Sequence, residues 1–208
     1  MTDTRERILA TTRALWNERG FTAVSVAELA ETLGMSNGNL SYHFPAKRDL
    51  VLALWDQAEK AHLELVREWV PATALDDLPG WIRALAGEMW RHRFLYRDAP
   101  HLFALAPELG ARARGSLIVE GRRQFQAGIE ALVEAGQLRI EAEQLPALVT
   151  TGWILVRHWI DYLVEARGVH QIRRGHVDEL VAQYLALLRP YLTPASRRRL
   201  ARREAPDA

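Results

Sequence analysis

The stretch from Ser25 to Leu50 constrains the fold of this chain most, because it contains two helix starts separated by a very short turn. Ser25 and Glu28 have the spacing of a capping box, in which each side chain accepts a hydrogen bond from a backbone N–H. Apolar residues then recur with the period of one helix face, and Gly34 follows where that helix would end. Ser36 is a second N-cap candidate only two positions later. Two capped helices joined by so short a turn must cross steeply, which predicts a helix-turn-helix.

The second of these helices, expected over residues 37–44, presents an outward surface without long charged side chains. Leu40 and Phe44 lie one turn apart and would anchor the helix to the one before it. The side chains that point away are small, polar or aromatic, which suits a helix lying in the major groove of DNA. The alternative is a solvent-exposed capping helix in an ordinary all-α domain.

Two cations open the next helix. Lys47 and Arg48 fall in its first turn, where the helix dipole disfavours positive charge by a few tenths of a kcal/mol, and Asp49 offsets this only in part. A phosphate group of bound DNA close to that helix end would explain the placement.

The segment GMSNGNLSYHFPAKRDLV, residues 34–51, resembles the helix-turn-helix signature of TetR-type (tetracycline-repressor-like) transcriptional regulators, and the connector at Phe21 also fits. The resemblance implies a homodimer whose N-terminal domains bind DNA and whose C-terminal domains dimerise and bind a small effector. It implies that the groove-facing helix and its cap supply base and phosphate contacts: Ser36, Asn37, Gly38, Asn39, Ser41, Tyr42 and His43. Ser25, Val26 and Lys47 match positions that usually contact phosphates in such proteins.

The overall charge does not by itself indicate a nucleic-acid binder. The formal net charge of the 208 residues is +1, and within residues 1–50 six Lys and Arg residues are balanced by six Asp and Glu residues. DNA-binding domains are commonly basic, so affinity would have to come from the local placement of contacts and from two domains binding together.

The rest of the chain is expected to be all-α, with a C-terminal helical ligand-binding and dimerisation domain following the three-helix DNA-binding domain. The predicted boundaries are residues 1–46 for the DNA-binding domain, 47–195 for the second domain and 196–208 for an Arg-rich tail that is solvated or frayed. The helices are expected at 5–19, 47–70, 79–97, 100–106, 107–135, 143–167 and 175–192, with a loop at 71–80.

The helices at 143–167 and 175–192 have almost no polar face. Helices of this kind must be covered on most sides, which one monomer of this size does not readily provide. We therefore predict a homodimer in which these two helices pair with their copies as a four-helix bundle.

An aromatic-rich set of residues is the candidate effector site. A packed core and an apolar pocket with a few orienting polar groups are both compatible with such a set, and the family resemblance raises the second interpretation to about equal weight. The candidates are Trp90, Phe94, His101, Phe103, Phe125, Trp153 and Arg157.

No catalytic, metal or cofactor motif is found in the sequence, and the absence of cysteine excludes disulfides and thiolate sites. His158 and Asp161 have the spacing to share a metal or a proton, but an ion pair on the helix surface is the simpler interpretation. An enzyme using these residues with His101 is disfavoured because no pair of catalytic groups has a recognisable arrangement.

The first residues are too polar for a signal peptide and no apolar run is long enough to span a membrane, so we expect a cytoplasmic protein. We predict a repressor that leaves a palindromic double-stranded DNA operator when a small apolar or amphipathic effector binds. Two alternatives remain open at this point: a helical small-molecule-binding protein that does not read DNA sequence, and a protein that coats DNA without sequence preference.

Overall fold

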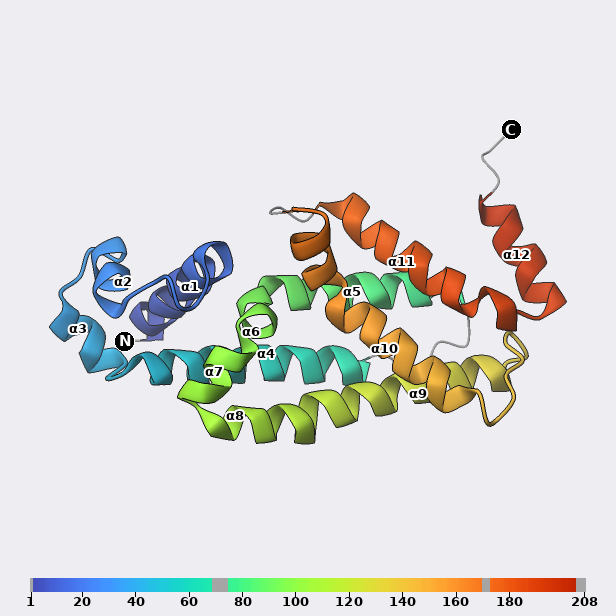
Figure 1. Ribbon diagram of the computed structural model, residues 1–208, viewed down its shortest axis with the longest axis horizontal. Helices are drawn as coiled ribbons and strands as arrows, with labels where there is room; N and C mark the ends of the chain where they lie inside the picture. The colour runs from blue at the N-terminus through green and yellow to red at the C-terminus, as the bar shows by residue number, and fades with distance from the viewer. Residues whose placement is uncertain (1, 69–74, 170–172, 205–208) are drawn as a thin grey trace. The chain divides into compact units, whose positions relative to one another are not determined.

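The computed structural model describes residues 2–68, 75–169 and 173–204 (Figure 1). Within these ranges the chain is helical and forms no β-strand, and one isolated bridge joins Leu138 to Leu192. This confirms the all-α prediction. Part of the predicted loop at 71–80 lies outside the described residues.

The chain divides into two compact units that do not follow the predicted boundaries. The first unit combines residues 1–63 with residues 88–117, and the second combines residues 64–87 with residues 118–208. The N-terminal helices of the chain therefore belong to the same unit as a helical segment from the middle of the sequence, residues 88–117. The predicted boundary at residue 46 remains a proposal about where the DNA-binding region ends.

The first unit is built around the C-terminal end of α1. The indole of Trp16 lies edge-on to two rings, with centroid distances of 5.1 Å to Phe21 and 5.3 Å to Phe94. Trp16 and Phe94 have almost no exposed surface, so α1 is held by both the helix-turn-helix and the later segment. The helices of this unit are α1 (Thr2–Arg19), α2 (Val26–Thr32), α3 (Asn37–His43), most of α4 (Lys47–Glu68), the end of α5 (Leu78–Arg91), α6 (Arg93–Arg97), α7 (Ala99–Leu105) and α8 (Pro107–Arg112).

The second unit has a core of aromatic rings. Phe125 lies between Trp81 and Tyr184, with centroid distances of 4.7 Å and 5.9 Å. A Cβ atom at Gly152 would lie 3.0 Å from the Tyr184 ring, so glycine there permits the close approach of two helices. The unit contains most of α5, together with α9 (Val119–Glu134), α10 (Leu145–Asp161), α11 (Arg174–Leu188) and α12 (Pro194–Glu204).

Three helix predictions need correction. The single helix expected at 79–97 is two, α5 and α6, separated at His92. The helix expected at 107–135 contains a π-helical turn at Ala113–Ile118 between α8 and α9. No glycine or proline stands at His92, so the apolar period gave no sign of that break, whereas Gly115 lies within the π-helical turn.

The Arg-rich tail is the third correction, because residues 194–204 form helix α12 instead of a frayed end. Thr193 receives a hydrogen bond from the backbone N–H of Ser196 at 3.4 Å, and Pro194 stands at the first helical position. Arg199 forms an ion pair with Asp76, which lies just before α5. The cap, the proline and this long-range contact stabilise a segment that its charge suggested would be solvated.

Candidate nucleic-acid interface

The turn between α2 and α3 has the predicted caps. The Ser25 hydroxyl accepts a hydrogen bond from the backbone N–H of Glu28 at 3.2 Å, and the Ser36 hydroxyl accepts one from Asn39 at 3.1 Å. Gly34, between the two helices, has a φ of +66°, a conformation that side-chain-bearing residues rarely adopt. These local contacts fix the short turn that sets the direction of α3.

Only half of the predicted capping box forms. Glu28 pairs with Arg19 instead of reaching back to the N–H of its own cap. The hydrogen bond from Arg19 is the main cause of a lowered pKa of Glu28. A guanidinium supplied by α1 competes better for this carboxylate than a single backbone N–H does.

The outward surface of α3 is exposed and makes few internal contacts. Leu40 and Phe44 are buried beneath it, whereas 73% of the Tyr42 side chain is exposed and its ring lies edge-on to His43 at 5.3 Å. Within residues 2–68 the structure records no intramolecular side-chain hydrogen bond for the outward polar residues. These are Asn37, Asn39, Ser41 and Tyr42, with exposed Gly38 among them and His43 half-buried at the edge.

Such a surface has its hydrogen-bonding groups available to an external partner. Hydroxyl and amide groups contact base edges and phosphates, and an exposed aromatic ring can pack against a sugar or a thymine methyl group. Of the predicted phosphate contacts at the start of α2, Ser25 is exposed and Val26 is half-buried against the core of the first unit.

Arg5 of α1 contacts the C-terminal end of α3. This contact was not predicted from the sequence. The guanidinium of Arg5 donates to the carbonyl oxygen of His43 at 2.7 Å and lies 4.2 Å from the centre of the Phe44 ring. The contact satisfies a carbonyl at the C-terminal end of α3, where helices leave such groups unpaired. Nothing local in the sequence links residues 38 positions apart.

Lys47 is bonded inside the protein. Its Nζ donates at 2.7 Å to the carbonyl oxygens of both Phe21 and Val24, and it lies 4.2 Å from the centre of the Phe21 ring. Burial lowers the pKa of Lys47, and the nearby charge of Asp98 opposes this shift. The ammonium group therefore ties α4 to the connector between α1 and α2.

Arg48 also has an internal partner, since it pairs with Glu108 of α8. The two cations thus have partners within the fold, so their placement does not require an external phosphate. This weakens the reason for which DNA was inferred at this helix end.

A second group of contacts joins α6 and the end of α5 to the C-terminal end of α1. The Asn17 amide donates to the carbonyl of Arg91 at 2.8 Å and accepts from the N–H of Phe94 at 3.1 Å. Arg97 donates to the carbonyl of Trp16 at 2.7 Å, and Asp98 accepts from the N–H of Phe21 at 3.0 Å. No local pattern in the sequence indicates this set, because the partners are 74 to 81 residues apart.

The predicted effector residues are not gathered in one unit. Trp90, Phe94, His101 and Phe103 belong to the first unit, and Phe125, Trp153 and Arg157 belong to the second. Phe94 has no exposed surface, so no space large enough for water borders it, and we assign it to the core. His101 is exposed, while Trp90, Phe103, Trp153 and Arg157 are half-buried.

His158 and Asp161 form the expected helix-surface pair, with Nδ1 and Oδ2 3.0 Å apart. No group of three or more metal-ligating side chains occurs in the part of the chain that the structure describes. In the same part, none of the helices is both long and apolar enough to cross a membrane.

The capped short turn and the exposed α3 surface define a DNA-binding protein of the helix-turn-helix class. Two family models match the chain: "Bacterial regulatory proteins, tetR family" over residues 8–54 and "Bacterial transcriptional repressor" over residues 58–200. The chain belongs to the TetR family of transcriptional regulators. Members of this family bind DNA to regulate transcription and are not enzymes. Both the small-molecule-binding protein that does not read DNA and the enzyme are therefore set aside.

Similar proteins match along nearly the whole chain. The regulator TtgR of Pseudomonas putida is 25% identical over 94% of this chain and 95% of its own length, and AcrR of Shigella flexneri is 23% identical over 88% and 90%. A TetR-family regulator from Marinobacter aquaeolei has the same fold, with a TM-score of 0.85, 27% identity and 97% coverage of both chains. A regulator from Saccharomonospora viridis, crystallised with choline, has a TM-score of 0.65 at 21% identity over 91% of this chain and 97% of its own.

Proposed function

We propose that this regulator is a homodimeric repressor that places α3 of each subunit in successive major grooves of a near-palindromic operator. The observation that carries the proposal is the exposed surface around Tyr42, whose polar groups have no partner within the described N-terminal residues. Two-fold symmetric proteins of this class read half-sites about one helical turn of DNA apart. The matching repressor model over residues 58–200 supports the direction of regulation.

The test is a gel-shift titration with the DNA upstream of the protein's own coding region, against a scrambled duplex of equal length. We expect a specific complex that survives an excess of scrambled competitor. Equal affinity for both duplexes, with a steep loss of binding in added salt, would instead support coating of DNA without sequence preference.

Dimerisation through α10 and α11 is supported by apolar side chains left exposed on α10 and at the start of the π-helical turn that follows it, Tyr162–Ala166. Ile154 on α10 and Tyr162 in the turn are 48% and 47% exposed, and His158 lies midway between them in the sequence. Large apolar side chains at this spacing favour a helix partner. We expect Ile154→Glu to shift the protein to a monomer in size-exclusion chromatography with light scattering.

The matched control is Val119→Glu on α9, an apolar residue that is 58% exposed. It should leave the oligomeric state unchanged. If both variants remain dimeric, or if both become monomeric, the predicted interface on α10 and α11 is wrong.

The proposed effector is a small apolar or amphipathic molecule bound in the second unit, where Phe125, Trp153 and Arg157 are the candidates from the predicted set. Their mixture of aromatic rings and one guanidinium fits an apolar site with a polar anchor. A relative crystallised with choline supports small-molecule binding in this fold, without indicating the ligand of this chain.

The contacts of α6 with α1 offer a route by which an effector could change the position of α3. They act within one unit, where Arg97 and Asp98 bond the backbone at the end of α1 and at the following turn. A shift of α6 would therefore displace the base of the DNA-reading helices.

The corresponding test compares Arg97→Ala with Arg93→Ala. Arg93 lies on the same short helix and stacks on Trp90 at 4.0 Å. We expect the Arg97 variant to lose operator affinity and the Arg93 variant to keep it. Equal affinities for the two variants would show that α6 does not hold the reading helices in place.

A further inference from the structure

The histidine at the break between α5 and α6, His92, is a buried titratable residue that the proposed function does not use. It is 2% exposed, and its Nδ1 has no hydrogen-bond partner in the part of the chain that the structure describes. Its Nε2 lies 3.3 Å from Oε1 of Glu88, one turn earlier on α5, but that oxygen is itself buried without a hydrogen bond among the described residues. An imidazole in such surroundings is held in its neutral form, because burial opposes charge.

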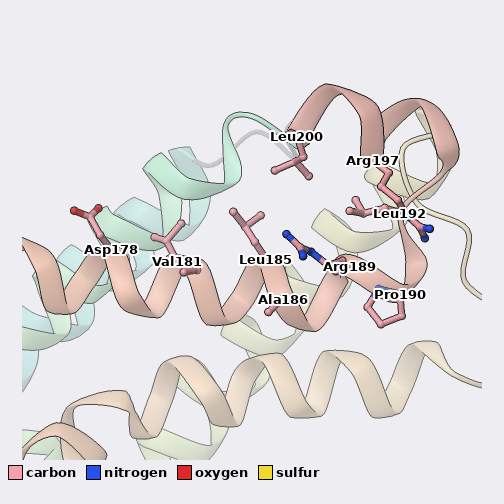
Figure 2. Close-up of a pocket in the computed structure, with 10 residues that line it drawn as sticks. Asp178, Val181, Leu185, Ala186, Arg189, Pro190, Leu192, Arg197 and Leu200 are labelled. Carbon is pink, nitrogen blue, oxygen red and sulfur yellow. The ribbon is translucent and has the colours of Figure 1, made fainter. Parts of the chain in front are cut away.

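The ionisable residues of the groove along α11 have a different environment. This groove has a volume of about 870 Å³ and is lined by charged residues near both ends (Figure 2). Asp178 accepts a hydrogen bond from Arg83 at 2.8 Å, and Arg189 and Arg197 are exposed to water. Their charges are therefore stabilised at any physiological pH, whereas a charge on the ring of His92 would be buried.

Charged groups approach His92 from two helices. Burial lowers the pKa of His92 to about 4, and the positive charges of Arg13 on α1 and Arg91 on α5 add to the shift. The negative charge nearby belongs to Glu88, whose Oε2 also lies 3.6 Å from Nε of Arg91. The guanidinium of Arg93, which begins α6, lies over an indole ring. The surroundings of the imidazole thus favour its neutral form.

His92 stands within the group of contacts that joins α6 to α1. The carbonyl of Arg91 accepts a hydrogen bond from the amide of Asn17 at 2.8 Å, and the N–H of Phe94 donates to the oxygen of the same amide at 3.1 Å. The carbonyl of His92 accepts from the N–H of Leu95 at 2.9 Å. A movement of the ring toward water would therefore disturb the bonds on both sides of it.

We propose that His92 makes the contacts between α6 and α1 sensitive to acid. A protonated imidazole leaves its buried place, the two hydrogen bonds of the Asn17 amide open, and the DNA-reading helices lose part of their support. Protonation of buried histidines switches packed contacts in pH-sensing proteins in this way. The effect on operator binding rests on the proposed function, whereas the opening of the contact does not.

Proton linkage gives the direction and the size of the effect. A histidine in water has a pKa near 6.5, so the opened form takes up a proton more readily than the closed form. The closed contact is therefore fully stable above about pH 6.5 and loses stability as the pH falls toward 4. Between pH 7.5 and pH 5.5, these two pKa values raise the equilibrium constant for opening by about tenfold.

The test is amide hydrogen exchange of the full-length protein at pH 7.5 and pH 5.5, read by mass spectrometry in peptides that cover residues 92–98 and the end of α1. After correction for the intrinsic exchange rate, protection in the wild type should be about tenfold weaker at the lower pH. His92→Gln stays neutral at both pH values and should show equal protection at both. His92→Phe is a second neutral variant, and circular dichroism checks that each one is folded.

The matched control is His101→Gln, an exposed histidine of α7 in the same unit, which should respond to acid as the wild type does. His62→Gln is needed as well, because burial also lowers the pKa of His62 on α4. Loss of the acid response in His62→Gln but not in the His92 variants would overturn the proposal. So would an equal response in the wild type and in both His92 variants.

Operator affinity at the same two pH values tests the effect on DNA binding. On acidification the wild type should lose about threefold more affinity than His92→Gln, within the tenfold limit that the opening equilibrium sets. Equal losses would show that opening of the contact does not reach the reading helices, which rejects that part of the proposal. If no operator complex forms at either pH, the proposed function fails instead, and hydrogen exchange still decides whether protonation of His92 opens the contact.

Discussion

The outward surface of α3 and the first turn of α4 follow each other directly in the chain, and both were predicted to contact DNA. They differ in what their polar groups do inside the protein. The side chains around Tyr42 have no internal hydrogen bond in the described N-terminal region, whereas Lys47 donates to two backbone carbonyls and Arg48 pairs with Glu108. Charge in a sequence therefore says less about a binding surface than the number of polar groups left without a partner.

The largest effect is expected for Lys47→Met. The substitution removes both hydrogen bonds of Nζ and leaves the carbonyls of Phe21 and Val24 without a donor, so the free energy of unfolding should fall by roughly 2–4 kcal/mol. Urea denaturation measures this change. The control is Lys60→Met, an exposed lysine on the same helix, which should change stability little.

A different outcome would restore the prediction of a phosphate contact. If Lys47→Met is as stable as the wild type but binds the operator more weakly, and the slope of log affinity against log salt becomes shallower by about one, then Lys47 binds DNA.

Tyr42→Ala should have the next largest effect, and on operator affinity alone. The ring is largely exposed, so its loss should leave the free energy of unfolding within about 0.5 kcal/mol of the wild type. Operator affinity should drop by about tenfold to a hundredfold, the size of one good base or stacking contact. Tyr42→Phe separates the contribution of the ring from that of the hydroxyl. Undiminished binding by the alanine variant would remove Tyr42 from the interface.

Ser36 lies between these extremes, because it caps α3 and is also a predicted DNA contact. Ser36→Ala should lower the free energy of unfolding by about 1 kcal/mol, and Ser36→Gly by only a few tenths. If the hydroxyl acts only as a cap, operator affinity should follow the same order in the two variants. Equal losses of affinity for both would indicate that the hydroxyl also contacts DNA.

The smallest effect is expected for Arg48→Ala. An exposed ion pair such as Arg48–Glu108 contributes less than about 1 kcal/mol, and an arginine held by Glu108 should contribute little to DNA binding. Thermal unfolding and the salt dependence of operator affinity should both stay near the wild-type values. The reciprocal variant, Glu108→Ala, would remove the partner of Arg48. If Arg48→Ala makes the salt dependence of operator affinity shallower, then Arg48 leaves Glu108 when the protein binds DNA.

Local chemistry explains why part of the fold was readable from the sequence. The caps at Ser25 and Ser36 act on backbone groups three residues away, and Gly34 is needed for one positive φ between them. These features involve neighbours along the chain, so spacing alone identifies them. The buried positions of Leu40 and Phe44 followed from helix period in the same way.

The contacts that were missed join residues far apart in the chain. Arg5, Asn17 and Lys47 donate hydrogen bonds to the backbone carbonyl oxygens of His43, Arg91 and Phe21, respectively. No rule of sequence spacing predicts such pairs. The predicted effector set failed to gather in one unit for the same reason, because its members were chosen by composition. Helix α12 is different, because Thr193 and Pro194 are a local helix-start pattern. The many arginines that follow led to the prediction of a solvated tail instead.

The internal use of cations near α3 bears on how such a regulator would search a genome. Non-specific attraction to duplex DNA comes from lysines and arginines that displace counterions from phosphates. With Lys47 bonded to carbonyls and Arg19 and Arg48 each paired with a glutamate, few mobile cations remain beside the reading helix. Random sequence would then retain only a small share of the molecules, and a modest copy number would suffice to keep one operator occupied.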